Sequence, residues 1–452
     1  MSTRRFVTTA LAAALFTVAG CAAEPTAPAP VGPEYAPRAF DVPTISALIA
    51  ERGAVTVLVR GPSDLRGPAA IAQWRQGVVA DLDPGVVLRT YRNLPAIAVA
   101  MDAETLAVLQ GSPAVHGLEL NISRPMATPA PPAQPGPVRS SFDNWHVEMV
   151  GADVTRRQGH RGEGQTIVVV DSGIDASHPL LKGRVVDGAC FSTNGIGRSS
   201  VCPGGAAEAY GVDAGEMCDV EPCEHGTHVA GIAAGTVARG ADLVSVQVAT
   251  RYDDCSSIGG PAGPCAVPED DDVLAALDHV LTLAETQPIA SVNVSIGGGA
   301  YMAECPNDLR AETIARLREA GVATVVSSGN EYHTDRVSAP ACVDEAIAVG
   351  STNRADQVSV FSNGGPQVDL LAPGQAIESS LPDRTMGAKS GTSMAAPHVA
   401  GAVAVLRGMD PELTVDEIEE ILKTTGTEVT DVRNGRTTPR LQLDAAAELL
   451  AE

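Results

Sequence analysis

The sequence predicts a doubly wound α/β domain with a mostly parallel sheet, preceded by a small ferredoxin-like α+β domain. Beyond about residue 140, apolar strand-like runs alternate with helical stretches, a shorter set of such segments lies between 53 and 121, and a proline-rich stretch separates the two. Unbroken apolar strands joined by helices are typical of a parallel sheet covered on both faces. A chain of 452 residues also exceeds the roughly 250 to 300 residues at which single cores stop growing.

Residues 1–21 have the pattern of an export signal. Arg4 and Arg5 precede an apolar run that ends near Ala19 and is too short to span a bilayer. The run closes with Val-Ala-Gly-Cys21, which resembles the lipobox of bacterial lipoproteins, in which the cysteine is lipidated. An ordinary signal, with Cys21 incidental, is the alternative. We expect export from a bacterial cell, as a membrane-anchored lipoprotein or as an extracellular or periplasmic protein.

A tether and a small domain follow the signal. We assign residues 22–52, which begin rich in proline and alanine, to the tether, because such a composition disfavours a packed core. Residues 53–121 predict the order β-α-β-β-α-β, with Asp102 as the cap of the second helix. The expected elements are strands Val55–Val59, Val86–Tyr91, Ala96–Ala100 and Val115–Leu120 and helices Ala69–Val79 and 103–110.

A second linker and the large domain complete the chain. Residues 122–139 are too rich in proline to sustain a helix or a central strand. Residues 140–452 are then the large α/β domain. Its expected strands are Thr166–Val170, Leu243–Val248, Val292–Ile296, Val322–Val326 and Ala346–Val349, with helices from Gly226 and Ser393 and over Val273–Ala284 and Leu309–Ala320.

Charge and cysteine content exclude some classes of function. A formal net charge of −24 without a basic stripe argues against nucleic acid as a partner. Besides Cys21 there are eight cysteines, and an even number in an exported chain suggests disulfides. Short loops favour Cys218 with Cys223 and Cys255 with Cys265, whereas the other pairings stay open. A zinc site is the weaker alternative, because no CxxC pair is present.

Three motifs carry candidate chemistry. Asp171 ends an apolar strand, where a carboxylate can orient an imidazole, bind Mg²⁺ or cap a helix. His225 begins His-Gly-Thr-His228 at a helix start and can accept a proton near neutral pH; two histidines could also bind a metal, but no third ligand lies nearby in sequence. Ser393 lies in the first turn of an apolar helix, where the dipole favours negative charge, although a simple capping serine has the same pattern.

Together these motifs resemble the signatures of the subtilisin-like serine peptidases, in the family order Asp, His, Ser. The resemblance covers roughly residues 140–447 and includes Ser-Ile-Gly-Gly at 295–298 and Ser-Gly-Asn-Glu at 328–331. It implies a secreted serine endopeptidase that acts through a triad and an acyl-enzyme, with Asn330 as an oxyanion donor. It also implies that the small domain is an inhibitory propeptide of a self-processed zymogen. The substrate-binding residues it implies are Ser295, Ile296, Gly297, Ser328 and Gly329.

The resemblance leaves several properties open. Cys- and Gly-rich insertions at 188–224 and 250–272 depart from the simplest members, so substrate preference and metal binding are not predicted. The acidic run 269–272 could bind a structural Ca²⁺, although an acidic first turn of a helix has the same pattern. We expect no cofactor for the chemistry, protein or peptide substrates, the chain's own propeptide as inhibitor, and a monomer. A catalytically silent binding protein and a lipase-like esterase are the rival classes; the GxSxG motif of the latter is absent.

Overall fold

The computed structural model describes residues 42–121, 123, 144–220, 222–258, 260 and 262–451, all within one compact unit spanning 34–452. The predicted export signal 1–21 with Cys21, and the linker 122–139 apart from Ser123, lie outside the described residues. Within the described part, none of the helices has the length and apolar content that a bilayer crossing requires.

The N-terminal domain, residues 42–121, has the predicted ferredoxin-like order. Its sheet runs β2-β3-β1-β4 with antiparallel neighbours. Asp102 caps the second helix of the predicted pattern by accepting a 2.8 Å hydrogen bond from the Thr105 amide. The elements are β1 Val55–Arg60, α2 Pro68–Val79, β2 Val87–Thr90, β3 Ala96–Met101, α3 Ala103–Gln110 and β4 Gly117–Leu120.

The boundary of the predicted tether is wrong at its C-terminal end. Residues 22–52 were expected to lack a packed core, but helix α1 spans Val42–Arg52. Ile45 and Ile49, one helical turn apart, are buried in the core of the N-terminal domain together with Val57 and Ile97. The proline-rich composition ends at Pro43, so the apolar spacing beyond it decides the local structure.

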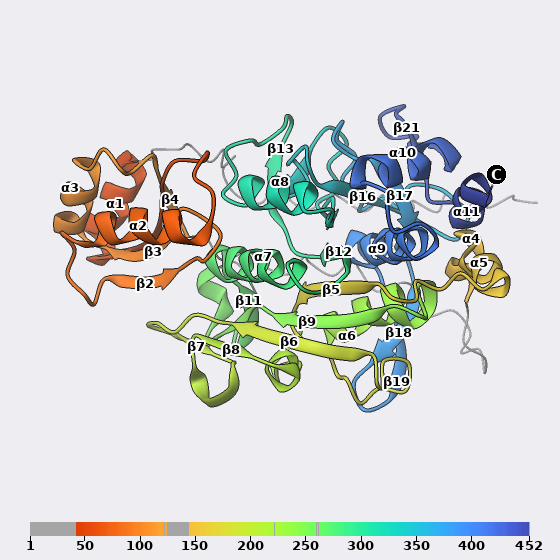
Figure 1. Ribbon diagram of the computed structural model, residues 1–452, viewed down its shortest axis with the longest axis horizontal. Helices are drawn as coiled ribbons and strands as arrows, with labels where there is room; N and C mark the ends of the chain where they lie inside the picture. Colours follow the sequence, from red (N-terminus) through yellow and green to blue (C-terminus); the bar gives the residue numbers. More distant parts are fainter. Residues whose placement is uncertain are drawn as a thin grey trace, which may run out of the picture. The chain divides into compact units, whose positions relative to one another are not determined.

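The main domain, residues 144–451, is built on a sheet with the strand order β20-β21-β17-β16-β14-β12-β5-β9-β6-β8. Neighbours from β21 to β6 are parallel, and β20 and β8 add antiparallel edges. The doubly wound prediction is confirmed (Figure 1). The strands are β5 Thr166–Asp171, β6 Val185–Phe191, β8 Glu208–Tyr210, β9 Asp242–Gln247, β12 Ile289–Val294, β14 Ala323–Ser327, β16 Ile347–Thr352, β17 Leu370–Pro373, β20 Thr427–Thr430 and β21 Thr437–Arg440.

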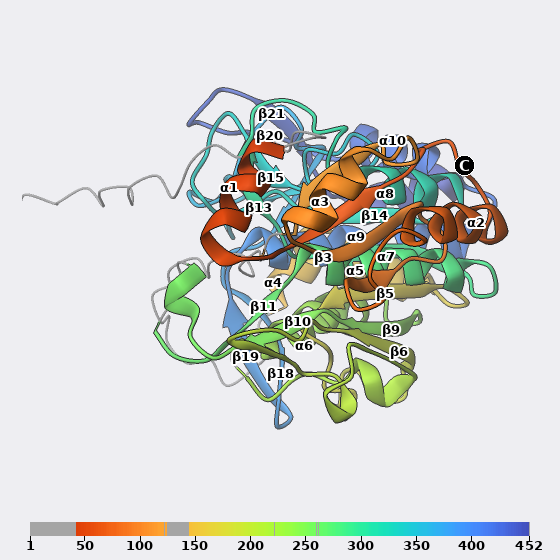
Figure 2. The ribbon, with the colours of Figure 1, turned by 90° about the vertical axis from the view of Figure 1, so that its left-hand side faces the viewer.

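Both faces of this sheet are buried. Ile167 and Val169 of β5 belong to an apolar cluster with α6 and α9, whereas Val168 and Val170 belong to a second cluster with α7 and α8. This alternation explains the unbroken apolar strands of the sequence. Figure 2, turned by 90°, shows the neighbouring strands β5, β9 and β6 of this sheet one below the other. The helices are α4 Trp145–Met149, α5 Ala152–Gln158, α6 Glu224–Ala230, α7 Asp270–Ala284, α8 Ala311–Glu319, α9 Thr392–Met409, α10 Val415–Thr425 and α11 Leu443–Ala451, with a π-helical turn η3 Gly231–Val237 after α6.

Smaller elements and four disulfides complete the main domain. The two insertions form a three-stranded sheet, β11-β10-β7, from Arg198–Ser200 (β7), Ala249–Tyr252 (β10) and Cys265–Pro268 (β11). Gly298–Tyr301 (β13) pairs with Val337–Ala339 (β15), and Ile377–Leu381 (β18) with Thr385–Lys389 (β19). Short 3₁₀ turns lie at η1 Pro203–Gly205, η2 Val212–Gly215 and η4 Cys255–Ile258. The bonds join Cys190 to Cys202, Cys218 to Cys223, Cys255 to Cys265 and Cys305 to Cys342, which confirms the two pairings that short loops favoured.

Candidate active site

Asp171 and His225 are in direct contact. Asp171 is the last residue of β5 and is fully buried. His225 lies in the first turn of α6, and its Nδ1 is 2.9 Å from each carboxylate oxygen of Asp171. A buried carboxylate bonded to Nδ1 fixes the imidazole orientation and leaves Nε2 as the nitrogen that can take a proton.

Ser172 braces this pair. Its amide donates to Asp171 Oδ1 at 2.7 Å, and its hydroxyl donates to the Cys223 carbonyl at 2.8 Å. The hydroxyl oxygen also accepts from the Gly226 amide at 3.0 Å. A Cβ on Gly226 would lie 2.3 Å from the Gly173 carbonyl oxygen, so only glycine allows α6 to start this close to the end of β5.

The second histidine of the motif faces elsewhere. His228 is fully buried, and its Nε2 is 3.1 Å from the Ile377 carbonyl and 3.0 Å from the Gly387 carbonyl of the β18–β19 hairpin. Burial lowers its pKa to about 3, so the ring is neutral. His225 and His228 therefore have separate partners, and the metal-binding alternative for this motif has no support in the geometry.

Ser393 is the second residue of α9 and is 2% exposed. Its hydroxyl donates to the Ser295 carbonyl at 3.3 Å, and its own carbonyl accepts from the Ser295 hydroxyl at 3.0 Å. Among the described residues, the hydrogen-bond partner of the Ser393 hydroxyl is the Ser295 carbonyl and not His225. Hydrogen bonds between a nucleophile and its base are commonly long in ligand-free proteins.

Asn330 is tied to the same helix start. Its Oδ1 accepts hydrogen bonds from the Thr392 amide and the Thr392 hydroxyl, both at 2.9 Å. These bonds fix the side-chain amide, and a Cβ on Gly391 would lie 3.3 Å from the Asn330 Nδ2 donor. The amide donor is therefore held beside the backbone that leads into Ser393.

The residues predicted to bind substrate flank this point. Gly329 donates its amide to the Thr392 hydroxyl at 3.2 Å, and the Ser328 hydroxyl donates to the Asn363 carbonyl at 3.0 Å. On the other side, residues 295–297 connect β12 to β13, with Ile296 buried. A Cβ on Gly297 would lie 2.8 Å from the Ala339 carbonyl oxygen. Both segments thus adjoin the first turn of α9.

The acidic run at the start of α7 faces arginines. Arg198 lies 2.5 Å from Glu269, Arg310 3.4 Å from Asp270, and Arg89 3.1 Å from Asp271 and 2.6 Å from Asp272. Burial raises the pKa of Glu269, and it raises that of Asp272 to about 7. Side chains paired in this way do not fit a cation site. Groups of three or more His, Cys, Asp or Glu side chains arranged for a metal are not found in the described part of the chain.

Arg89 belongs to the N-terminal domain, which contacts α7 through further polar groups. The amides of Arg92 and Asn93 each donate to Asp278 at 2.8 Å. At the start of α7, the Asp271 amide donates to the side-chain oxygen of Asn121 at 3.0 Å. The N-terminal domain therefore supplies a helix cap to the main domain.

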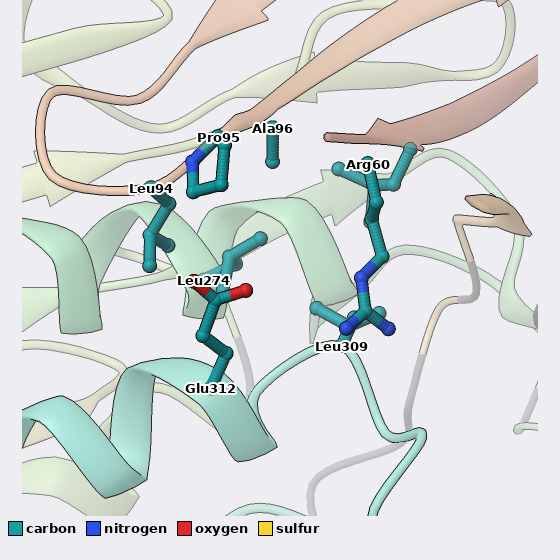
Figure 3. A pocket seen from close by; sticks show the side chains of 8 residues that line it. Arg60, Leu94, Pro95, Ala96, Leu274, Leu309 and Glu312 are labelled. Atoms are coloured by element: carbon teal, nitrogen blue, oxygen red, sulfur yellow. The ribbon is translucent and has the colours of Figure 1, made fainter. Parts of the chain in front are cut away.

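Apolar side chains line the same contact. Leu94 and Pro95 of the N-terminal domain face Leu274 of α7 and Leu309, the latter just before α8, around a small cavity (Figure 3). Arg316 of α8 donates to the Asn93 carbonyl at 2.5 Å. The contact combines buried apolar area with ion pairs, as in specific protein interfaces.

Three supporting residues were not identified from the sequence, namely Ser172, Thr392 and Asn293. Ser172 and Thr392 bond to Asp171 and Asn330 respectively, and the Asn293 amide donates to the Ser295 hydroxyl at 2.9 Å. Ser172 and Thr392 stand directly beside predicted site residues in the chain. A search for hydroxyl groups beside the three motif residues would have found these two, whereas nothing local marks Asn293.

The fold and this site define an α/β hydrolytic enzyme of the serine type, and comparison with known proteins agrees. Residues 162–440 match the subtilase family. The chain is 30% identical over 270 residues to the major intracellular serine protease of Bacillus subtilis (strain 168), covering 59% of this chain and 75% of that protein. It is 35% identical over 288 residues to an extracellular serine proteinase of Thermus sp. (strain Rt41A), covering 62% and 60%. It is 32% identical over 268 residues to subtilisin-like protease 4 of Arthroderma benhamiae, covering 58% of this chain and 57% of that protein. The match thus spans less than two thirds of the length of the Thermus and Arthroderma proteins. The chain belongs to the subtilase family of serine peptidases.

Proposed function

We propose that this protein is a secreted endopeptidase that cleaves protein or peptide substrates through Asp171, His225 and Ser393. The observation that carries the proposal is the hydrogen bond that His225 Nδ1 donates to the buried Asp171, at 2.9 Å, together with the position of Ser393 in the first turn of α9. This arrangement leaves Nε2 of His225 for proton transfer and puts the serine at the positive end of a helix dipole. The net charge of −24 argues against a nucleic-acid substrate.

The reaction follows from these roles. The Ser393 hydroxyl attacks the peptide carbonyl carbon while His225 takes the hydroxyl proton, and the resulting oxyanion is met by the Asn330 amide and the Ser393 backbone N–H. Collapse breaks the C–N bond as His225 gives its proton to the leaving amine. Water, activated by His225, then hydrolyses the acyl-enzyme and regenerates Ser393. No cofactor takes part in these steps.

The substrate would lie along two backbone edges. Ser295, Ile296 and Gly297 can hydrogen-bond an extended peptide as an added strand, and Ser328 with Gly329 would form a wall of the pocket for the residue before the cut. A monomer provides every group that these steps use. Main-chain recognition of this kind suits an endopeptidase, because it requires no free chain end.

Covalent labelling tests the activity. We expect a fluorophosphonate probe to label the wild-type protein and casein to be digested, with both signals lost in Ser393→Ala and retained in Ser177→Ala, a change at an exposed serine. Labelling without casein digestion would favour an esterase. An unlabelled wild-type protein would indicate a catalytically silent binding protein.

The N-terminal domain is proposed to be an inhibitory propeptide that the enzyme removes itself. Its ion pairs with Asp271 and Asp272, its cap on α7 and the antiparallel bridge from Ser123 to Glu269 support a domain that stays bound while the following segment is cut. We expect Ser393→Ala to accumulate as the unprocessed chain. Normal processing of that variant would show that another enzyme makes the cut.

Export and lipid anchoring are part of the same proposal. Residues 1–21 would direct export, and lipidation of Cys21 would tether the protein to a membrane. Mass spectrometry of the N-terminus of the cell-associated precursor of Ser393→Ala is the test. A diacylated Cys21 is expected, and an unmodified N-terminus would overturn the anchor.

A further inference from the structure

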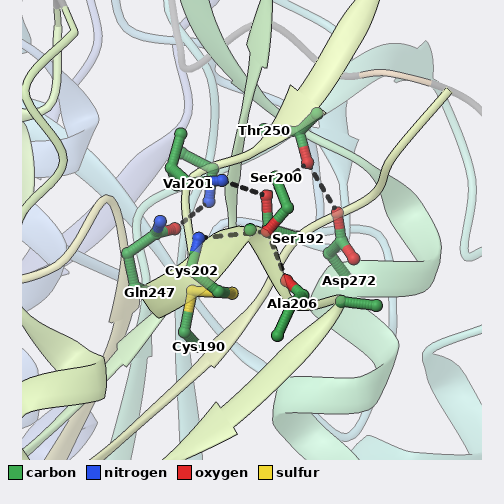
Figure 4. The surroundings of a disulfide bond; sticks show 12 residues. Cys190, Ser192, Ser200, Val201, Cys202, Ala206, Gln247, Thr250 and Asp272 are labelled. Atoms are coloured by element: carbon green, nitrogen blue, oxygen red, sulfur yellow. Dashed lines mark hydrogen bonds between the residues drawn. A yellow bond between two sulfur atoms is a disulfide. The ribbon is translucent and has the colours of Figure 1, made fainter. Parts of the chain in front are cut away.

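The two insertions that depart from the simplest subtilases meet in one small sheet. Strand β7 comes from the first insertion, and β10 and β11 from the second. The Cys190–Cys202 disulfide closes the loop that contains β7, and Cys255–Cys265 closes the turn between β10 and β11. Figure 4 shows how the first of these loops is bonded to β10, through the 3.0 Å contact between the Ser192 and Thr250 hydroxyls. One disulfide therefore braces the loop that carries β7, and the other braces the β10–β11 hairpin.

This sheet brings three polar side chains to one point. Arg198 of β7 lies 2.5 Å from Glu269 Oε1 and donates to the Tyr252 hydroxyl at 3.1 Å. The Tyr252 hydroxyl in turn donates to Glu269 Oε1. Glu269 is 1% exposed and Tyr252 is 8% exposed. We call Arg198, Tyr252 and Glu269 the polar cluster.

A hydroxyl group of the chain itself occupies this cluster. Ser123 Oγ is 2.6 Å from the Tyr252 hydroxyl and 3.3 Å from both carboxylate oxygens of Glu269. The backbone of Ser123 forms an antiparallel bridge with Glu269. Ser123 thus pairs with the main domain through one bridge, two residues after the Asn121 cap on α7.

The cluster is built for a neutral hydroxyl rather than for a cation. Arg198 already neutralises Glu269, and Oε1 receives both Arg198 and Tyr252. The second carboxylate oxygen of Glu269, Oε2, accepts a hydrogen bond from the Ser123 hydroxyl and from no other group in the described part of the chain. Burial and the neighbouring Glu269 raise the pKa of Tyr252 to about 12, which keeps the phenol protonated as a donor. Because the single Tyr252 proton goes to Glu269 Oε1, the cluster offers two acceptors, the Tyr252 oxygen and Glu269 Oε2, to the proton of a small hydroxyl group.

We propose that the polar cluster is a substrate subsite that binds a serine or threonine side chain at one fixed position N-terminal to the bond that is cut. The inference rests on the proposed peptidase function. In the unprocessed chain Ser123 fills the subsite. Once the N-terminal segment has left, an extended substrate pairs with the same edge beside Glu269 and presents its own hydroxyl group.

Cleavage profiling of the mature enzyme on a peptide library tests the subsite. We expect serine and threonine to be enriched at one upstream position. A peptide that carries serine there should show about tenfold higher kcat/KM than its alanine counterpart, since the hydroxyl bonds to a charged group. In Tyr252→Phe and in Glu269→Gln this ratio should fall to near one, and Tyr210→Phe, at an exposed tyrosine, should retain it.

The two peptides compete in one reaction, so the ratio does not depend on how much of a variant folds. Efficient cleavage without an upstream hydroxyl preference would overturn the subsite, and so would a preference for lysine or arginine or a ratio that the variants leave unchanged. Absence of all cleavage would instead overturn the peptidase function. The two failures are therefore distinct.

Discussion

The candidate active site and the insertion sheet are held in place by different forces. Asp171 and Ser393 lie at the ends of β5 and α9, and α9 is buried without a break from Thr392 to Leu406. The insertion sheet has only small apolar clusters, which include cysteines and a few neighbouring residues. Its geometry rests on two disulfides and on ion pairs such as Arg198 with Glu269.

The difference in bracing matches a difference in role: the candidate active site would carry out the reaction, and the insertion sheet would select the substrate. A nucleophile and its base need positions held within fractions of an ångström, which close packing in a large core provides. A subsite that binds a side chain takes no part in bond making and tolerates a looser frame, so short covalent links suffice in place of a core. Perturbing one region should therefore leave the other largely intact.

The largest effect is expected at Asp171. Asp171→Asn keeps the shape of the side chain but loses the charge that fixes the His225 tautomer, so activity should fall about 10⁴-fold. The rate of self-processing of the full chain after refolding measures this. Asp175→Asn, four residues along, should process normally because Asp175 accepts from Ser177 and not from His225. Processing of Asp171→Asn at the wild-type rate would remove Asp171 from the site.

Asn330→Ala is expected to have the next largest effect. Loss of one oxyanion donor typically lowers kcat about 10² to 10³-fold, and KM should change little because the donor acts mainly on the transition state. Steady-state kinetics of the mature enzyme provide the measurement. Asn353→Ala, which alters an asparagine that organises a turn through Ala355 and Gln357, is the matched control. Equal kcat in the two variants would exclude Asn330 from the oxyanion hole.

The same contrast explains what the sequence could predict. Asp171, His225 and Ser393 sit at a strand end and at helix starts, which short apolar runs and small residues mark locally. Helix α1 was missed because its two core isoleucines follow a proline-rich stretch. The pairing of Cys190 with Cys202, and of Cys305 with Cys342, depends on tertiary proximity that spacing does not encode. The contact of Arg89 with Asp272 joins two domains and has no local signal at all.

Removing a disulfide tests whether the regions are braced independently. With a separation of 12 residues, the Cys190–Cys202 bond should contribute roughly 3 kcal/mol to local stability. In Cys190→Ala/Cys202→Ala on a Ser393→Ala background, amide exchange over β6 to β8 should rise about a hundredfold while β5 stays protected. Cys305→Ala/Cys342→Ala is the matched control and should leave β7 unchanged. Equal acceleration in β5 would show that the two regions unfold together.

Acid, in contrast, should destabilise the packed core around the candidate active site. His146 of α4 and His228 are buried and neutral, and burial lowers the pKa of each to about 3 from 6.5. Because the unfolded chain binds protons below pH 6.5 and the folded chain does not, stability is present above that pH and is lost as pH falls. Between pH 6.5 and about 5 each histidine should contribute a loss of about 2 kcal/mol.

Urea unfolding of Ser393→Ala at neutral pH and near pH 5 measures this loss. His146→Gln should reduce the difference between the two pH values by the contribution of one histidine. His146 Nδ1 lies 2.8 Å from His398 Nε2, and the nearby His228 also lowers the pKa of His146. The substitution therefore removes one of three buried histidines that lie close together. His116→Gln, at an exposed histidine, should leave the difference unchanged. An unaltered difference in His146→Gln would place the acid sensitivity outside this core and weaken the contrast with the disulfide-braced insertion sheet.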